Sequence, residues 1–187
     1  RGDRKENGKE QTDFSYASDL IKMIRQQGDF NIVGACYPES HPESADLKSD
    51  IKNLKYKVDA GVTHLITQLF FNNEDYYDFV EKAAIADINV PIQAGIMPVV
   101  NKSQIERIVS LCGASLPKRL VKFLSHYENS PAALMDAGIS YATEQIIDLI
   151  SNGAPGIHLY TMNNPTVARR ISESIANILA CVNEKEG

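Results

Sequence analysis

Residues 63–71, THLITQLFF, are a nearly continuous apolar run between Gly61 and the pair Asn72–Asn73. A short apolar run bounded by turn-forming residues is typical of a buried strand. The preceding segment, 45–60, repeats apolar side chains at steps of three and four, which predicts one face of a helix that Gly61 ends. Either asparagine suits the cap of a second helix over 74–86. The sequence here therefore predicts helix, strand and helix in succession.

This alternation continues along the whole chain, and we expect one domain over residues 1–187 without an internal linker. The predicted strands cover about 31–37, 63–71, 91–97 and 156–162, and the predicted helices cover about 15–27, 45–60, 74–86, 102–112, 117–127, 131–151 and 165–182. A helix between successive strands implies right-handed crossovers and a parallel sheet.

Four βα units leave two interpretations of the fold open. Either the strands form a small open α/β sheet, or they are the second half of a (β/α)₈ TIM barrel, which typically needs about 250 residues. The chain begins with Arg1 and not with Met, which favours the half-barrel. A half-barrel would leave unpaired strand edges unless a partner covers them.

The overall composition excludes several functional classes. The chain has 19 basic and 24 acidic residues, so its net charge of -5 argues against a nucleic-acid partner. No apolar run approaches the roughly 18 residues that a membrane span needs, and no signal peptide is recognisable. Three scattered cysteines favour a reducing, cytoplasmic location over a disulfide framework.

Ligands of parallel α/β folds bind at the carboxyl ends of the strands, where we expect Tyr37, Gln68, Met97 and Tyr160. The predicted strands contain no lysine for a Schiff base and no cluster of metal-ligating side chains, so we predict no metal site. No P-loop or glycine-rich dinucleotide motif is present. Neutral polar and aromatic groups suit a flat heteroaromatic ligand.

The loop after the first predicted strand, YPESHPE at 37–43, is stiffened by two prolines and contains Tyr37 and His41. On the next helix, Asp50, Asn53 and Lys57 share one side. A lysine there is able to reach a phosphate, and the other two are able to hold ribose hydroxyls. The alternative interpretation is a solvated helix face.

Several motifs, in the same order along the chain, resemble those of the methylenetetrahydrofolate reductase family. They are RGD at 1–3, YASDL at 16–20, CYPESHPES at 36–44, DIKNLKYKVDAG at 50–61, HLITQLFF at 64–71, GIMPV at 95–99 and HLYTMNNP at 158–165. The resemblance implies a (β/α)₈ barrel, of which this chain matches the part from just after the fourth strand to the end. It also implies an FAD-dependent oxidoreductase that uses NADH or NADPH to reduce 5,10-methylenetetrahydrofolate to 5-methyltetrahydrofolate in methionine biosynthesis.

The resemblance further implies roles for individual residues. Asp3 and Gln68 match residues that take part in catalysis and bind both flavin and folate, and Gln104 and Ile108 match the folate side of the site. The expected FAD contacts are Arg1, Gly2, Asp3, Tyr16, Ala17, Ala35, Tyr37, His41, Asp50, Asn53, Lys57, Ile66 and Tyr160. Where this chain has Tyr56, family members often have a basic residue, so one diphosphate contact is in question.

The family takes its general acid, a glutamate, from the first barrel strand, which these residues do not include. We therefore expect the 187-residue chain to have little turnover by itself and its parent to be a homo-oligomeric reductase. Two alternatives stay open. One is a non-catalytic half-barrel that serves as an assembly or FAD-binding module. The other is a different FAD-linked barrel enzyme, similar to proline dehydrogenase.

Overall fold

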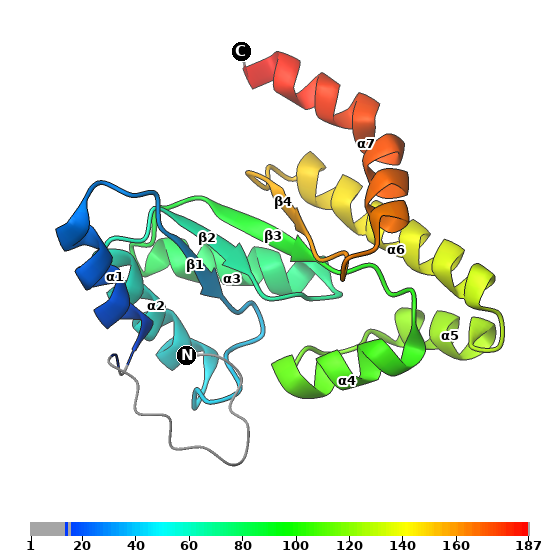
Figure 1. Cartoon of the computed structure of the whole chain (residues 1–187), viewed down its shortest axis with the longest axis horizontal. Coiled ribbons are helices and arrows are strands. Elements are labelled where there is room, and N and C mark those ends of the chain that lie inside the picture. The colour runs from blue at the N-terminus through cyan, green and yellow to red at the C-terminus, as the bar shows by residue number, and fades with distance from the viewer. Residues whose placement is uncertain (1–13, 15, 187) are drawn as a thin grey trace.

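The computed structural model describes residue 14 and residues 16–186, which form a sheet lined by helices (Figure 1). Along the chain the elements are α1 (Ala17–Gln27), β1 (Val33–Cys36), α2 (Leu47–Asp59), β2 (His64–Thr67), α3 (Asn73–Ile85), β3 (Ile92–Ile96), α4 (Lys102–Cys112), α5 (Lys118–Tyr127), α6 (Pro131–Ser151), β4 (Ile157–Leu159) and α7 (Pro165–Glu186). The predicted order of strands and helices is confirmed.

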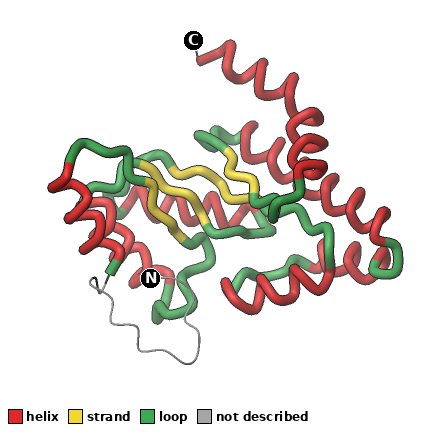
Figure 2. Tube along the Cα trace, in the orientation of Figure 1, coloured by secondary structure: helices red, strands yellow, loops and turns green. Residues whose placement is uncertain are grey.

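The four strands lie in the order β1-β2-β3-β4, and every neighbouring pair is parallel (Figure 2). Each strand is followed by helix before the next begins, as the alternation of apolar patterns predicts. The parallel α/β class is therefore confirmed. Consecutive order with helical crossovers is also the arrangement of four successive units in a (β/α)₈ barrel.

All four strands begin within two residues of their predicted starts, but all four end earlier than predicted. The largest difference is in β2, which ends at Thr67 and not at 71. Leu69, Phe70 and Phe71 are buried although they lie outside the strand, because they fill the core from a loop. Apolar side chains indicate that a segment is buried, but not that it pairs with another strand. A prediction from the apolar pattern alone therefore makes this strand too long.

The strand β4 ends at Leu159 and not at 162, because the backbone turns there. Met162 and Asn163 both have positive φ angles, 50° and 61°, in the region that side chains other than glycine rarely adopt. Strained residues of this kind often accompany functional loops. The helices agree better with the sequence, and α6 has its predicted ends because Ser130 caps its first turn and Pro131 begins it.

One face of the sheet is covered by helices, and this is where the main core lies. Leu65, Ala94 and Ile96 are fully buried on this face, against apolar side chains from α2, α3, α6 and α7. On the opposite face Val33 is 54% exposed and Ala35 is also exposed. The two faces of the sheet thus differ, and the described helices leave the second one open.

In a second apolar cluster, α4, α5 and the start of α6 pack against the carboxyl ends of the strands. Leu69 and Met97, which follow β2 and β3, pack there with Ile105 of α4 and Leu120 of α5. The sequence placed Met97 among the polar strand ends, but it is 5% exposed and belongs to this core. The cluster positions α4 beside the end of the sheet where ligands of parallel folds bind.

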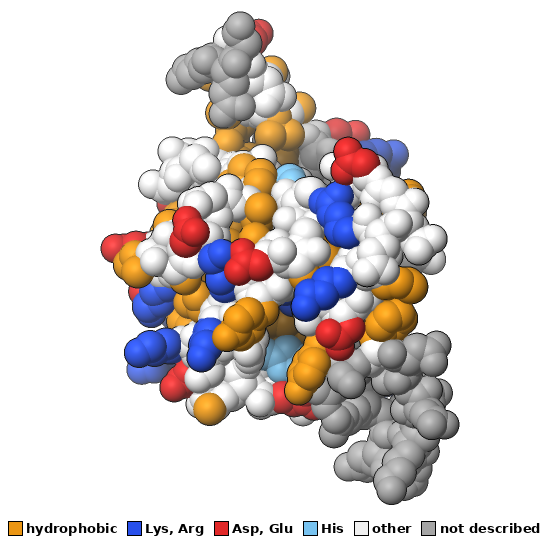
Figure 3. Space-filling view, turned by 90° about the vertical axis from the view of Figure 1, so that its left-hand side faces the viewer, with side chains coloured by type: hydrophobic (Ala, Val, Ile, Leu, Met, Phe, Trp, Pro, Cys, Tyr) orange, Lys and Arg blue, Asp and Glu red, His pale blue; other side chains and the backbone are white. Residues whose placement is uncertain are grey.

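The face that carries α1 and α2 mixes both charges with apolar side chains (Figure 3). Three of these apolar residues, Tyr16, Leu20 and Met23, belong to the first helix and its cap, and Tyr16 is 66% exposed. Among the described helices, none is both long and apolar enough to cross a bilayer.

Candidate functional site

Ala35 and Ile66, two of the expected flavin contacts, lie opposite each other in the β1–β2 register. Both belong to the face of the sheet that the described helices leave open, where Ala35 is exposed and Ile66 is half-buried. Their small and branched apolar side chains give this part of the sheet a flat surface. A planar ring can pack on such a surface without desolvating a polar group.

Lys57 of α2 reaches this region from the edge of the sheet. Its Nζ donates a 2.6 Å hydrogen bond to the carbonyl of Ala35. The next carbonyl, of Cys36, accepts the Gln68 N–H from β2 at 2.7 Å. Since successive carbonyls of a strand point in opposite directions, the Ala35 carbonyl faces the unpaired edge of β1. The bond to Ala35 holds the Lys57 ammonium group at the edge of the candidate site, and burial lowers the pKa of Lys57.

The loop after β1 is ordered by Asp50, the first of the three polar residues on the α2 face. One carboxylate oxygen accepts the His41 N–H at 3.0 Å and the other accepts the Ser44 hydroxyl at 3.1 Å. The His41 ring meets Tyr37 edge to face, with centroids 4.6 Å apart. Ser40 between them has a φ of 79°. Asp50 therefore shapes the loop that presents both rings.

A residue that the sequence did not single out, Glu39, ties this loop to another one. Both of its carboxylate oxygens accept the Ser115 N–H, at 2.9 and 3.1 Å, across 76 residues of sequence. Burial raises the pKa of Glu39, against the lowering effect of the bonds from Ser115. Ser115 lies between α4 and α5, so Glu39 joins the β1 loop to the segment that covers the carboxyl ends of the strands.

Gln68 and Tyr160 approach each other at the ends of β2 and β4. The Tyr160 hydroxyl donates to the carbonyl of Thr67, the residue before Gln68, at 3.0 Å. The Gln68 side-chain oxygen accepts the N–H of Leu69 at 2.9 Å, which orients the amide group. The resemblance placed both residues in one site, and the structure brings them together at the same end of the sheet.

The other expected site residues are distributed differently. Tyr16 and Ala17 are exposed at the start of α1, and Asn53 is exposed on α2. Ile108 is half-buried on α4 and packs against the second apolar cluster, as Tyr160 also does. Gln104 lies in α4 as well, and nothing more of its side chain is described. Arg1, Gly2 and Asp3 lie outside the described residues.

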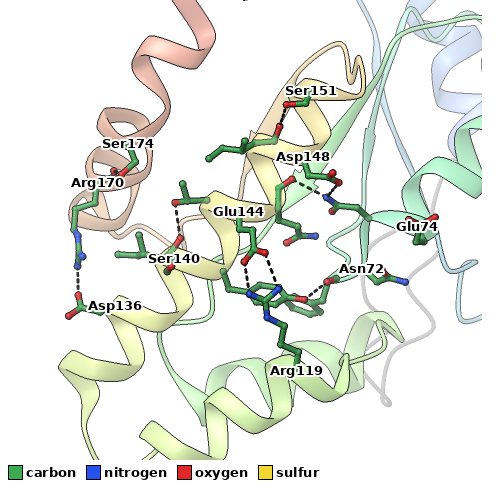
Figure 4. Close-up of a pocket in the computed structure, with 17 residues that line it drawn as sticks. Asn72, Glu74, Arg119, Asp136, Ser140, Glu144, Asp148, Ser151, Arg170 and Ser174 are labelled. Carbon is green, nitrogen blue, oxygen red and sulfur yellow. Dashed lines mark hydrogen bonds and ion pairs between the residues drawn. The ribbon is translucent and has the colours of Figure 1, made fainter.

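A groove of about 960 Å³ lies elsewhere, along α6 (Figure 4). Both arginines of its lining pair with carboxylates of the same lining. Arg119 binds Glu144 through two hydrogen bonds, and Arg170 binds Asp136. These charges are matched within the chain, and the groove contains none of the residues expected at the site. It is therefore not the candidate site.

The described residues also limit the chemistry available. No group of three or more His, Cys, Asp or Glu side chains in this part of the chain is placed to hold a metal ion. Burial raises the pKa of Cys36 to about 12, so its thiol is neutral at physiological pH and a poor nucleophile. The four strands carry no carboxylate. What remains is binding and orientation by aromatic, amide and ammonium groups.

Comparison with known proteins places the chain among sequences of one family. Residues 1–176 match the family model for methylenetetrahydrofolate reductase. A 5,10-methylenetetrahydrofolate reductase of Buchnera aphidicola subsp. Acyrthosiphon pisum is 37% identical over 96% of this chain and 59% of its own length. The enzyme of the same name from Escherichia coli K12 is 32% identical over 86% of this chain and 54% of its own length. The chain thus spans a little over half the length of these relatives.

A solved structure from Clostridium thermocellum, of a protein that binds two copies of 5-methyl-5,6,7,8-tetrahydrofolic acid, superposes with a TM-score of 0.56. It is 22% identical and covers 86% of this chain and 59% of its own, so it supports the fold alone. The match of the family model over nearly all of the sequence, with two relatives above 30% identity, decides the assignment. The chain belongs to the methylenetetrahydrofolate reductase family.

Proposed function

We propose that this chain supplies the flavin-binding half of a reductase that converts 5,10-methylenetetrahydrofolate to 5-methyltetrahydrofolate with NADH or NADPH. The observation that carries the proposal is the juxtaposition of Ala35, Ile66, Gln68 and Tyr160 at the carboxyl ends of three strands. Family membership makes FAD the expected cofactor, and it would supply hydride transfer between the nicotinamide and the folate.

The residues present fit FAD in two respects. The Ala35–Ile66 pair offers a flat apolar surface of the kind on which an isoalloxazine ring can lie. Lys57, whose ammonium meets the edge carbonyl of Ala35, is a cation at the border of that surface, as a diphosphate requires. Tyr37 and His41 add an edge-to-face aromatic pair in the loop that follows β1. Asn53, Tyr16 and Ala17 remain proposed contacts, together with Arg1, Gly2 and Asp3.

For the folate, the proposed contacts of this chain are Gln68, Gln104, Ile108 and Asp3. Gln68 offers an amide that both donates and accepts, which suits the edge of a pterin ring. Ile108 supplies apolar contact from α4. The Glu39 carboxylate holds the α4–α5 segment against the β1 loop, beside the proposed folate side. These residues bind and orient, and none of those described on the strands is an acid.

We infer in addition that the 187-residue chain does not turn over by itself, because the family's general acid comes from a strand outside it. Binding of FAD and catalysis are thus separable in this chain. An assembly or FAD-binding module remains the second candidate, since the sheet face around Ala35 is exposed and β1 carries an unpaired edge.

The test begins with the purified chain, titrated with FAD and followed by flavin absorption and fluorescence. We expect saturable binding, and NAD(P)H-dependent reduction of methylenetetrahydrofolate only after the chain is refolded with the amino-terminal half of the Escherichia coli relative. The amino-terminal half alone is the matched control. Absence of FAD binding in both the chain and the refolded complex contradicts the proposal. Full activity of the chain alone contradicts the inference on the missing acid.

A further inference from the structure

Tyr160 lies in the loop just after β4, yet hydrogen bonds hold both its backbone and its side chain. Its backbone N–H donates to the Ile96 carbonyl of β3 at 2.8 Å, and its hydroxyl donates to the Thr67 carbonyl of β2 at 3.0 Å. Since β3 lies between β2 and β4, the ring crosses a whole strand to reach its acceptor. The His158 ring, 4.7 Å away, packs edge to face against it.

The Thr67 carbonyl can accept the Tyr160 hydroxyl because the Thr67 side chain, and not this carbonyl, accepts the hydrogen bond from β3. The N–H of Gly95 on β3 donates to the Thr67 hydroxyl oxygen at 2.8 Å, in a fully buried position. The β2–β3 register correspondingly ends one residue earlier, at Ile66 and Gln93. Thr67 thus accepts a hydrogen bond from β3 with its side chain and a second one from Tyr160 with its backbone carbonyl.

Glycine at position 95 is required by the same arrangement. A Cβ atom there would lie 2.2 Å from the Thr67 carbonyl oxygen and 2.8 Å from Cε2 of the Tyr160 ring. Such distances are far below van der Waals contact, so any side chain at 95 would displace the ring or break its hydrogen bond. The space that glycine leaves is filled by the Tyr160 ring.

The bond to Thr67 also decides which chemistry Tyr160 is able to perform. Its hydroxyl proton is engaged by a backbone carbonyl, and burial raises the pKa of the phenol above its usual value. The side chain is therefore neutral, and toward a ligand it offers its ring and an oxygen lone pair, but no proton.

We propose that Thr67 and Gly95 are positioning residues that fix Tyr160 as a rigid, neutral wall of the flavin site and exclude it from acid catalysis. The part of this inference that concerns flavin rests on the proposed function. The positioning of the ring does not, because the hydrogen bonds and the space at Gly95 exist without a ligand.

The test uses the full 187-residue chain with ¹³Cζ-labelled tyrosine, and the Tyr160 resonance is assigned with Tyr160→Phe. Thr67→Val removes the hydroxyl at constant shape, and Gly95→Ala inserts the Cβ atom. In both variants we expect the Tyr160 resonance to move and its alkaline titration to shift. Thr67→Ser, which keeps the oxygen, is expected to restore the wild-type signal. An unmoved Tyr160 resonance in the folded Thr67→Val variant overturns the proposal, even if Gly95→Ala fails to fold.

Thr63→Val is the matched control at the opposite end of β2, where the Thr63 hydroxyl accepts the Ile32 N–H at 3.0 Å. It removes an equivalent hydrogen bond between strands, and we expect it to leave the Tyr160 resonance unchanged. In the FAD titration, Thr67→Val is expected to weaken binding about fivefold to tenfold, and Thr63→Val to leave it near wild type. Absence of FAD binding in both the wild-type chain and the refolded complex contradicts the proposed function alone, since the resonance still decides the positioning.

Discussion

The Glu39 carboxylate receives the Ser115 N–H with both of its oxygens, at 2.9 and 3.1 Å, and so joins two loops at the carboxyl end of the sheet. Pro42 of the β1 loop also lies near Gly113, with its Cγ 3.5 Å from the position that a Cβ atom there would take. Since Gly113 directly follows α4, the β1 loop lies beside the end of that helix.

Replacing Glu39 by alanine is expected to lower the free energy of unfolding by about 1 kcal/mol, because the Ser115 N–H loses its acceptor. Urea denaturation of the full chain measures this. Glu173→Ala removes an exposed glutamate from α7 and is the control, for which we expect a change of less than about 0.5 kcal/mol. Equal effects of the two substitutions would contradict a specific role for Glu39.

The same carboxyl group gives a pH dependence of stability. Burial raises the pKa of Glu39 above 4.5, so the folded chain keeps this proton to a higher pH than the unfolded chain. Its contribution is therefore present below pH 4.5 and declines as the pH rises through the folded pKa. We expect Glu39→Gln to remove this decline, so that the variant gains stability relative to wild type as the pH rises from 4.5 through the folded pKa. A constant difference between the two across that range would refute the shift.

The Asp148 carboxyl group is expected to give a pH dependence of stability opposite to that of Glu39. Its carboxylate accepts hydrogen bonds from Asn73 at 2.6 Å and from the Tyr77 hydroxyl at 2.7 Å, which lower its pKa below 3.8. Its contribution is present above pH 3.8 and is lost as the pH falls through the lowered pKa. Asp148→Asn should be less stable than wild type at neutral pH, and the difference should shrink in acid. Asp78→Asn, at an exposed pair with Lys82, is the control with a small effect.

Gly138 of α6 is a sharp test of packing. A Cβ atom there would lie 1.8 Å from the Val99 carbonyl oxygen, so the helix touches the loop after β3 through backbone alone. Alanine usually favours a helix by about 1 kcal/mol over glycine, but here we expect Gly138→Ala to destabilise the chain by about 1–3 kcal/mol. Ser140→Ala, on the exposed side of the same helix, should be neutral or stabilising. Thermal unfolding distinguishes the signs, and a more stable Gly138→Ala variant would contradict the close approach.

Lys57 tests the proposed diphosphate contact. Lys57→Met retains most of the apolar side chain and removes the ammonium, so we expect FAD binding to weaken about tenfold or more. Lys52→Met, on the exposed face of the same helix, is the matched control and should bind FAD like the wild type. The FAD titration measures both variants, and equal affinities would exclude Lys57 from the site. Unfolding curves establish separately that each variant is folded.

The helices and strands, and their order, can be predicted from local patterns in the amino-acid sequence. Helix α6 occupies its predicted range because Ser130, Pro131 and the pair Asn152–Gly153 are local signals, readable without the rest of the chain. The parallel sheet followed from the alternation of strand and helix, since a crossover of that length permits little else. The motifs of the family also lie in the sequence, and they named most of the candidate site before any contact was known.

Only the tertiary structure decided where strands stop and which side chains meet. The apolar residues 69–71 resemble a strand but fill a core from a loop, a distinction that hydrophobicity alone does not contain. Thr67 and Tyr160 are 93 residues apart, and Glu39 and Ser115 are 76 apart. Contacts between segments so distant depend on how the whole sheet twists and packs. The same sheet geometry pairs Ala35 with Ile66, and no local pattern specifies it.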